Sequence, residues 1–488
     1  MAAAAAFSLH AAVISGAVVE SLTSRPLARA LVTVQPVGGT PGASKSKRAN
    51  AHGGFSFASL APGIYVVKAS RNSFIPAEYG QKRWNSAGTP VVVDEDARVF
   101  LDIRLHRYSA INGTVVDEND EGLPGHDVLA YRNAKAPELM AHATADERGV
   151  YRLHGLEPGT YVVRTAGEQS NEGSYLPTFS KETGKLDEAV TLELFPDQEA
   201  NDVDVRPLPG RLYSLSVEVT PRNPDTTITL VSEMGRKTIE APACRFAGVP
   251  PGDYELFAQS PAEPGPGESF QCAYQRISLG ADAKVSLLLR PPAGVSVSGA
   301  PANDPGEVRI RRADLAGAGP PSVLPLQNGA ATIPAGRWEV MLLPPAGAYV
   351  SNLTGSIFLA RRGRPDGWQE IASPPLPGIG GVRFILSGGA SAIHGVVKNS
   401  DDPMSGVPVY LEAYDANANK RVADLCIATA DMHGRYHFEN LAPGTYRILG
   451  TFEYLSPDVE IMDAAGAQLL TVDPHSDLSR DLELYTIR

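Results

Sequence analysis

One stretch decides the fold of this chain: Gly53-Gly54-Phe55-Ser56-Phe57-Ala58-Ser59-Leu60-Ala61-Pro62-Gly63-Ile64-Tyr65. Close copies of it lie at residues 149–161 and 434–446, and partial copies lie at 249–254 and 333–338. Counted from the first glycine, the close copies share an aromatic residue at +2, an apolar residue at +4, Leu at +7, Pro-Gly at +9 and +10, and Tyr at +12. A unit that recurs at this scale indicates an array of similar domains.

The repeated stretch has the pattern of a β-hairpin. Apolar residues at +2 and +4 alternate with polar ones, which is the period of a strand with one buried face. Pro-Gly suits a turn, because proline presets φ and glycine tolerates positive φ. The strand that follows, for example Tyr65-Val66-Val67, is rich in residues that favour strands. We interpret the repeated tyrosine as a packed ring whose hydroxyl bonds the backbone near the turn, as in a tyrosine corner, rather than as a catalytic group.

A second shared phrase precedes each close copy of the hairpin. Gly16-Ala17-Val18, Gly113-Thr114-Val115 and Gly395-Val396-Val397 stand 46 to 49 residues before the glycine of the Pro-Gly turn. Alternating segments such as 99–105 and 478–484 follow the hairpins. Each module is therefore predicted to contain two strands, a loop, the hairpin and a closing strand.

The turn glycines divide the chain into five modules. They stand at positions 63, 159, 252, 336 and 444, which is a spacing typical of small domains. Short Pro-rich segments such as 206–210 and 290–294 are expected to act as semi-rigid spacers. The expected domains are five β-sandwiches at residues 13–106, 107–207, 208–292 (degenerate), 293–388 (divergent) and 389–488.

These phrases resemble the carboxypeptidase regulatory-like repeat, most clearly in the first, second and fifth modules. Asp146 and Asp431 fill its acidic position, and Asn50 replaces the acid in the first module. The resemblance implies a tandem array of seven-stranded Greek-key sandwiches with a prealbumin-like (transthyretin-like), carbohydrate-binding-like fold. It also implies a secreted or surface location and a supporting role as a stalk, spacer or weak binding surface.

The resemblance extends to collagen-adhesin B-type domains, which often carry a Lys–Asn isopeptide bond assisted by a Glu four residues after the Tyr. The corresponding positions here are Ala69, Thr165, Ala258 and Gly450. The resemblance therefore implies no such cross-link in this chain.

Composition and the N-terminus indicate an exported protein. The net charge is −12 with scattered basic residues, which argues against a nucleic-acid partner, and no apolar run is long enough to span a membrane.

Residues 1–12 lack a basic segment, but Ala6-Phe7-Ser8 resembles a signal-peptide cleavage site. We interpret them as the remnant of a signal peptide truncated in this sequence, the alternative being only an N-terminal tail. The expected location is extracytoplasmic: secreted, periplasmic or at the cell surface.

Three cysteines are too few for a disulfide framework. Cys244 occupies the +2 position of the third module, so it is expected to point into the core, and Cys272 lies on a later strand of the same module. A disulfide between them in an oxidising compartment and two buried free thiols are both left open. Cys426 is expected to be a core residue.

The sequence contains no catalytic motif or metal-ligand pattern in the right context, and the ten histidines are scattered. We therefore expect no catalytic residues, no cofactor and no metal. The remaining candidates are aromatic residues in the loops that follow the tyrosine strand, because loops at one end of a sandwich are common binding sites. The candidate ligand-binding residues are Tyr79, Trp84, Tyr175, Phe179 and Trp368, with the alternative that their rings cover the open ends of the cores.

Two classes of function remain open. The chain is predicted to be a non-catalytic surface or periplasmic spacer or binding protein, whose partner is a carbohydrate or a cell-surface protein. The alternative is an enzyme, or an accessory subunit of one, with an unrecognised site in the divergent fourth module. Exposed Trp84 and Trp368 rings would favour the first, and a pocket with several titratable groups in residues 294–388 would favour the second.

Overall fold

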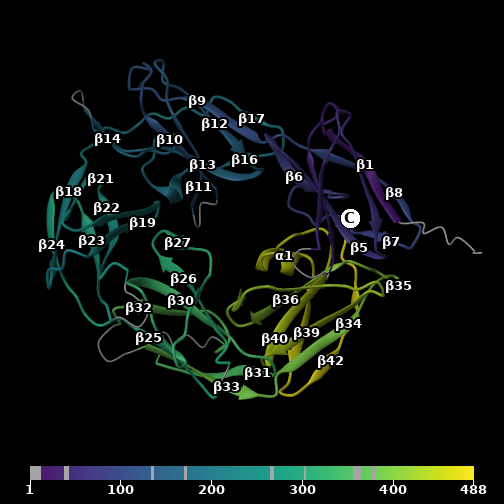
Figure 1. Cartoon of the computed structure of the whole chain (residues 1–488). Helices are drawn as coiled ribbons and strands as arrows, with labels where there is room; N and C mark the ends of the chain where they lie inside the picture. The colour runs from purple at the N-terminus through teal and green to yellow at the C-terminus, as the bar shows by residue number, and fades with distance from the viewer. Residues whose placement is uncertain are drawn as a thin grey trace, which may run out of the picture. The chain divides into compact units, whose positions relative to one another are not determined.

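The computed structural model describes residues 12–37, 43–132, 137–169, 173–263, 269–301, 304–355, 364–375 and 381–487. Regular structure in these ranges is almost entirely β-strand (Figure 1). The helical segments there are α1 (Val459–Ala464) and the 3-10 turn η1 (Leu186–Glu188). The prediction of an all-β tandem array is confirmed. The expected signal-peptide remnant lies outside the described residues, except for Ala12, which begins the first strand.

The chain divides into two compact units. One contains the first and fifth modules, ending at Tyr108 and resuming at Ser391, and the other is Ser109–Ala390 with the second, third and fourth modules. Each module consists of two sheets that face each other across an apolar core.

The first and fifth modules share one pattern of sheets. In the first module the orders are β4-β1-β8 and β3-β2-β5-β6, with β7 paired to β5. Their bounds are β1 (Ala12–Glu20), β2 (Leu31–Pro36), β3 (Lys45–Arg48), β4 (Gly54–Leu60), β5 (Gly63–Arg71), β6 (Phe74–Glu78), β7 (Val91–Val93) and β8 (Arg98–Leu105). In the fifth module the orders are β35-β34-β39, with β42 and β43 on β34, and β37-β36-β40-β41, with β38 on β36. Their bounds are β34 (Ser391–Asn399), β35 (Asp402–Pro403), β36 (Pro408–Asp415), β37 (Lys420–Arg421), β38 (Cys426–Thr429), β39 (Arg435–Leu441), β40 (Gly444–Gly450), β41 (Gln468–Val472), β42 (Asp477–Ser479) and β43 (Leu482–Glu483).

The second and third modules repeat this pattern. In the second the orders are β12-β9-β17 and β11-β10-β13-β16, with the separate hairpin β14-β15. Their bounds are β9 (Ser109–Thr114), β10 (Asp127–Arg132), β11 (Glu138–Thr144), β12 (Val150–Leu156), β13 (Gly159–Thr165), β14 (Glu168–Gln169), β15 (Ser174–Tyr175), β16 (Leu192–Leu194) and β17 (Glu199–Ala200). The third module, in its described residues, has the seven-strand pattern implied by the resemblance, with orders β21-β18-β24 and β20-β19-β22-β23. Their bounds are β18 (Tyr213–Thr220), β19 (Thr227–Ser232), β20 (Gly235–Glu240), β21 (Arg245–Val249), β22 (Gly252–Ser260), β23 (Gln271–Leu279) and β24 (Ala283–Leu288).

The fourth module departs from the pattern by adding a strand to its first sheet. The orders are β29-β25-β33-β31 and β27-β26-β30-β32, with β28 on β26. Their bounds are β25 (Gly294–Ser298), β26 (Glu307–Asp314), β27 (Gly317–Ala318), β28 (Ser322–Leu324), β29 (Ala330–Thr332), β30 (Gly336–Leu343), β31 (Ala348–Thr354), β32 (Gln369–Ser373) and β33 (Gly381–Gly388).

The first and last strands of a module lie side by side in parallel. β1 pairs with β8 from Val13↔Arg98 to Glu20↔Leu105, and the same arrangement joins β18 to β24, β25 to β33 and β34 to β42. This pairing explains the glycine of the upstream phrase. A Cβ atom at Gly16 would lie 2.0 Å from the Leu101 carbonyl oxygen, and one at Gly395 would lie 1.8 Å from that of Arg480. Only glycine fits where the two backbones approach this closely.

The two strands around the repeated Pro-Gly turn do not form the predicted hairpin. β4 pairs with β1 and β5 with β2, and in the second module β12 pairs with β9 and β13 with β10, so the turn connects the two sheets of a module.

The repeated tyrosine forms the predicted corner. The hydroxyl groups of Tyr65, Tyr161, Tyr254 and Tyr446 each donate to the carbonyl oxygen four residues earlier, at 2.7 Å. The +2, +4 and +7 residues of the close copies are buried, also as predicted. They are Phe55, Phe57, Leu60, Tyr151, Leu153, Leu156, Tyr436, Phe438 and Leu441.

Candidate functional site

The loop between β6 and β7 carries Tyr79 and Trp84. The Trp84 side chain is 41% exposed, and its backbone carbonyl accepts a hydrogen bond from the Gln81 amide at 2.9 Å. Tyr79 is half-buried and packs against the core of the first module. Trp84 therefore presents an aromatic surface to solvent, whereas Tyr79 mainly completes the core.

The two loop aromatics of the second module have different surroundings. Phe179 is buried, with 1% of its surface exposed, and packs against Tyr131 and Val162. The structure corrects the prediction for Phe179, because its ring closes an apolar cluster and offers no free plane to a ligand. Tyr175 is half-buried, and its ring meets that of buried His126 edge-on, with centroids 5.5 Å apart.

Trp368 of the fourth module lies just before β32. It is half-buried, and the guanidinium of Arg311 lies 4.2 Å from the centre of its ring. A cation at this distance from an indole face is attracted by the ring quadrupole. One face of Trp368 is therefore already occupied by a protein side chain.

The cysteines correct two expectations. Cys244 and Cys272 are both reduced, so the disulfide that was left open between them is not formed. Cys244 is exposed rather than in the core, because β21 begins only at Arg245, one residue later. Phe246, at +4, is the first buried side chain of that strand. Cys426 is also exposed, so the prediction that it is a core residue is wrong, whereas Cys272 is buried.

The loop around Trp84 also contacts the fifth module. The Ala87 amide donates to the Phe452 carbonyl, and the Leu455 amide donates to the Asn85 carbonyl, both at 3.0 Å. Lys82 Nζ lies 3.1 Å from Oε1 of Glu453, whose side chain is 3% exposed. The first and fifth modules thus share a direct polar joint.

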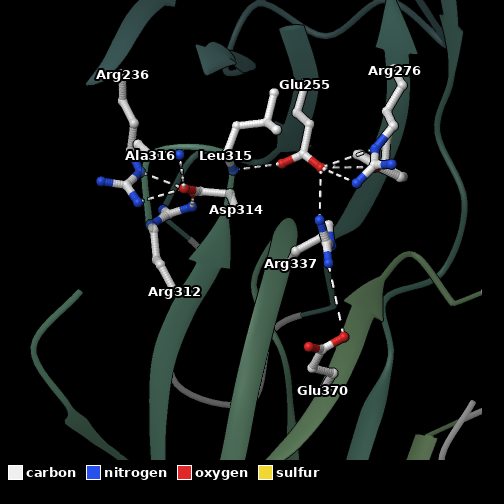
Figure 2. A network of polar contacts seen from close by, with 10 residues as sticks. Arg236, Glu255, Arg276, Arg312, Asp314, Leu315, Ala316, Arg337 and Glu370 are labelled. Carbon is white, nitrogen blue, oxygen red and sulfur yellow. Dashed lines mark hydrogen bonds and ion pairs between the residues drawn. The ribbon is translucent and has the colours of Figure 1, made fainter. Parts of the chain in front are cut away.

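The joint between the third and fourth modules is built on a buried carboxylate. Glu255 on β22 is fully buried, and its Oε1 accepts from Arg276 Nη2 of β23 and from Arg337 Nη1 of β30, each at 3.1 Å (Figure 2). Its Oε2 accepts from the Leu315 backbone amide, also at 3.1 Å. Arg337 and Leu315 belong to the fourth module, so one carboxylate of the third module holds two groups of its neighbour.

A second buried carboxylate makes the reverse connection. Asp314, at the end of β26 in the fourth module, is fully buried and binds Arg236 of β20 in the third module (Figure 2). Its Oδ1 lies 2.5 Å from Arg236 Nη2, and its Oδ2 lies 2.9 Å from Arg236 Nε. Arg312 Nη1 lies 3.9 Å from Oδ2 of Asp314. Each module therefore contributes one arginine to a buried carboxylate of the other.

The same joint has an apolar part. Val231, Phe257, Phe270 and Cys272 of the third module are buried against Ala335 of the fourth. The Cys272 sulfur lies 3.5 Å from the Ser373 hydroxyl oxygen. That hydroxyl donates to the Ile333 carbonyl at 2.7 Å and accepts from the Ala293 amide at 3.0 Å.

Burial shifts the proton affinities of groups in this joint. It raises the pKa of the Cys272 thiol to about 11, although the hydrogen bond with Ser373 opposes the change. Burial also raises the pKa of the Tyr274 hydroxyl, and the adjacent Glu255 adds to the effect. The hydrogen bond to Glu255 raises the pKa of Arg276, and burial lowers that of Arg312. These groups bind one another, so the arrangement holds two modules together rather than presenting a reactive group.

These ion pairs were not predicted from the sequence, although a signal was present. Glu255 directly follows the corner tyrosine, where the first two modules have Val66 and Val162. The fifth module has Arg447 there, which is 4% exposed and pairs with the fully buried Glu412. A charged residue inside an otherwise apolar strand marks a place where the outer face of the sheet is covered by something that neutralises it.

Comparisons with known proteins support the interpretation of the repeats. The carboxypeptidase regulatory-like domain matches residues 13–106 and 110–194. A serine-aspartate repeat-containing protein E of Staphylococcus aureus (strain MSSA476) is 26% identical over 275 residues, or 49% of this chain and 24% of that protein. The bone sialoprotein-binding protein of Staphylococcus aureus is also 26% identical over 275 residues, with 23% of its length covered. The alignments thus span about a quarter of these relatives.

Solved structures with some likeness include two pilins. The minor pilin of Streptococcus agalactiae is 15% identical, with 43% of this chain and 98% of that chain covered and a TM-score of 0.27. The major pilin subunit of Bacillus cereus is 10% identical, with coverages of 77% and 99% and a TM-score of 0.16.

Among the described residues, no helix has the length and apolar character needed to cross a bilayer. The tyrosine corner occurs in both segments that the family matches. The chain therefore carries two tandem carboxypeptidase regulatory-like domains, at residues 13–106 and 110–194.

Proposed function

We propose that this chain is a non-catalytic, extracytoplasmic array of β-sandwiches that acts as a spacer and binding module at the cell surface. The observation that carries the proposal is the reciprocal joint between the third and fourth modules, made by Glu255 with Arg337 and by Asp314 with Arg236. A spacer must keep its modules from bending freely. Two ion pairs of opposite polarity beside an apolar cluster fix one orientation, because any rotation separates a fully buried carboxylate from the arginine that neutralises it.

The relatives favour a role in binding at a surface. One of them is named for binding bone sialoprotein, and the similarity covers 49% of the present chain. The aligned part is about a quarter of that relative, so the shared element is a tandem repeat region and not a whole protein. We infer from this that the chain supports or contributes to contacts with a protein or carbohydrate partner.

The fourth module offers little for the alternative of an enzyme. One hollow on it, about 400 Å³, is lined mainly by Gly, Ala, Val, Ser and Thr, with Arg383 as the ionisable residue among those lining it. Acid–base catalysis needs convergent titratable groups. Elsewhere in the module, Arg311 Nε lies 2.6 Å from Oε2 of Glu339, so these two charged groups neutralise each other.

A site-directed distance measurement tests the joint. Spin labels at exposed Lys284 in the third module and Val323 in the fourth should give one narrow distance distribution, after the exposed Cys244 and Cys426 are replaced by Ser. Glu255→Gln should broaden it, whereas the control Glu370→Gln should not, because Glu370 is partly exposed and 3.8 Å from Arg337. A broad distribution in the unmodified joint would contradict a spacer role.

A second experiment tests binding. The whole chain should retain glycans or surface proteins in an array and pull-down assay, and Trp84→Ala should weaken retention of carbohydrate if the exposed indole is the platform. Trp368→Ala tests the half-buried ring in the same way, and Phe100→Ala is the matched control, since that ring is 72% exposed on β8 outside the loops. Retention unaffected by Trp84→Ala and Trp368→Ala would remove the loop aromatics from the proposal.

A further inference from the structure

A hollow of about 610 Å³ lies where the second module meets the third. Strands β10 and β13 of the second module contribute Tyr131 and Arg164 to its lining, and the third module contributes the β19–β20 turn with Met234 and the residues around Tyr254. Its size is in the range of pockets that hold a small ligand.

Arg164 in this hollow is a cation without a hydrogen-bond partner among the described residues. Its guanidinium lies 5.3 Å from the centre of the buried Phe179 ring, and its Nε is buried without a partner. Burial lowers the pKa of Arg164, which shows that the surroundings disfavour its charge. A buried donor that makes no bond costs free energy, so an arginine in this condition calls for an acceptor from outside the chain.

The groups beside Arg164 limit what that acceptor can be. Tyr131 is 6% exposed, and its hydroxyl forms no hydrogen bond within the described residues. The Tyr254 hydroxyl, in contrast, already donates a hydrogen bond to the Pro250 carbonyl oxygen. Glu233 and Asp253 also line the hollow, and Glu233 interacts electrostatically with Arg164. Lys237 and Arg236 line the hollow as well, and Arg236 is already bound to Asp314. Two carboxylates therefore offset the two remaining cations, which suits a singly charged group better than a multiply charged phosphate or sulfate.

We infer that this hollow binds a compact ligand through a single carboxylate, which accepts hydrogen bonds from Arg164 and from the Tyr131 hydroxyl. The planar guanidinium matches the two oxygens of a carboxylate. Leu129, Met234 and Pro177 supply an apolar wall for the body of the ligand. The carboxylate of a sugar acid and that of a short peptide share this chemistry. The site is separate from Trp84 and Trp368 and does not rest on the proposed function.

Calorimetric titration of the full chain tests the site with two pairs of probes. Methyl β-glucuronide is compared with methyl β-glucoside, and N-acetyl-alanyl-alanine with its amide, so that each pair differs at the carboxylate. Saturable binding of one acid but not of its neutral counterpart is expected, and the pair that binds identifies the source of the carboxylate. Inorganic phosphate should bind more weakly than that acid.

Three variants tie the binding to the hollow. Arg164→Gln should weaken the binding about tenfold or more, and Tyr131→Phe should weaken it about threefold to tenfold, because each loses a hydrogen bond to a charged group. Glu233→Gln should strengthen it, since a repelling charge is removed; a gain of affinity cannot come from misfolding. Arg152→Gln is the matched control, because this arginine is an exposed residue of β12, and it should leave the affinity unchanged.

The inference is overturned if neither acid binds to the unmodified chain, if the neutral probes bind equally well, or if phosphate binds more tightly than the acids. It is also overturned if Glu233→Gln leaves the affinity unchanged while Arg152→Gln lowers it.

Discussion

The indole Nε1 of Trp338 donates a hydrogen bond to the Pro334 carbonyl oxygen, 2.9 Å away and four residues earlier in the chain. The tyrosine hydroxyl groups of the other four modules make this same bond at 2.7 Å. The fourth module has lost most of the repeated phrase, yet it has kept a ring with a polar hydrogen at this position. The bond between ring and turn is therefore the most persistent element of the repeat.

Replacing Trp338 by Tyr or by Phe separates the hydrogen bond from the ring. Both substitutions remove similar volume, but only Tyr retains a donor that can reach the turn. We expect Trp338→Phe to be about 1 kcal/mol less stable than Trp338→Tyr, which is the usual net contribution of one hydrogen bond. Thermal unfolding of both variants measures the difference, and equal midpoints would show that the bond does not contribute.

Neutralising Glu255 should lower the stability of the fourth module towards urea. Glu255→Gln leaves Arg337 and Arg276 without their shared carboxylate, and the loss of hydrogen bonds to this charged group costs about 2 kcal/mol. Urea unfolding followed by tryptophan fluorescence reports on this, because Trp338 and Trp368 both lie in the fourth module. The control Glu370→Gln should change the stability by less than about 0.5 kcal/mol. Equal effects of the two variants would contradict the role given to Glu255.

The fifth module offers a test of whether a buried ion pair is needed at all. Arg447 and Glu412 are both buried, and Arg421 also binds Glu412 at 2.8 Å. Arg447→Met should destabilise the module by about 3 kcal/mol, because the carboxylate keeps only one cation. Adding Glu412→Leu should recover part of the loss, since the uncompensated charge is then removed. Hydrogen exchange of β36 and β40 measures both changes, and a double variant less stable than Arg447→Met would contradict the expectation.

The buried thiol of Cys272 makes the stability of the joint depend on pH. The pKa of Cys272 is raised to about 11 in the folded chain, so the folded state favours the protonated thiol. Its contribution to stability is complete below the pKa of an unfolded cysteine, about 8.5, and is lost as the pH rises through 11. At pH 8, thiol reagents should modify Cys244 and Cys426 but not Cys272. Rapid modification of Cys272 in the folded chain would contradict its burial.

The two strands and the turn of the repeated stretch were predictable from the sequence because their signals are local, but their pairing was not: β4 pairs with β1 and β5 with β2, so the Pro-Gly turn connects two sheets and does not close a hairpin. The period of Phe55, Phe57 and Leu60 and the Pro-Gly turn fix a strand, a turn and a buried face without reference to the rest of the chain. The third module shows the limit of this argument. Cys244 occupies the right position in the count, but β21 starts after it, so the position lies outside the strand.

The joints were not predictable in the same way, because their partners are far apart in the sequence. Glu255 and Arg337 are separated by 82 positions, and Arg236 and Asp314 by 78. A single charged residue in an apolar strand shows that some partner exists but not which one. Phe179 illustrates the converse, since an aromatic residue in a loop gives no sign of whether a neighbouring cluster will bury it.

The parallel pairing of the first and last strands has a mechanical consequence. In the first module β1 runs beside β8 from Val13↔Arg98 to Glu20↔Leu105, so the chain enters at one end of this pair and leaves at the other. Tension applied to the two ends of the module slides these strands along each other and loads their hydrogen bonds all at once, instead of opening them one by one. A module built in this way resists stretching through its whole ladder of bonds, as a tether under load requires.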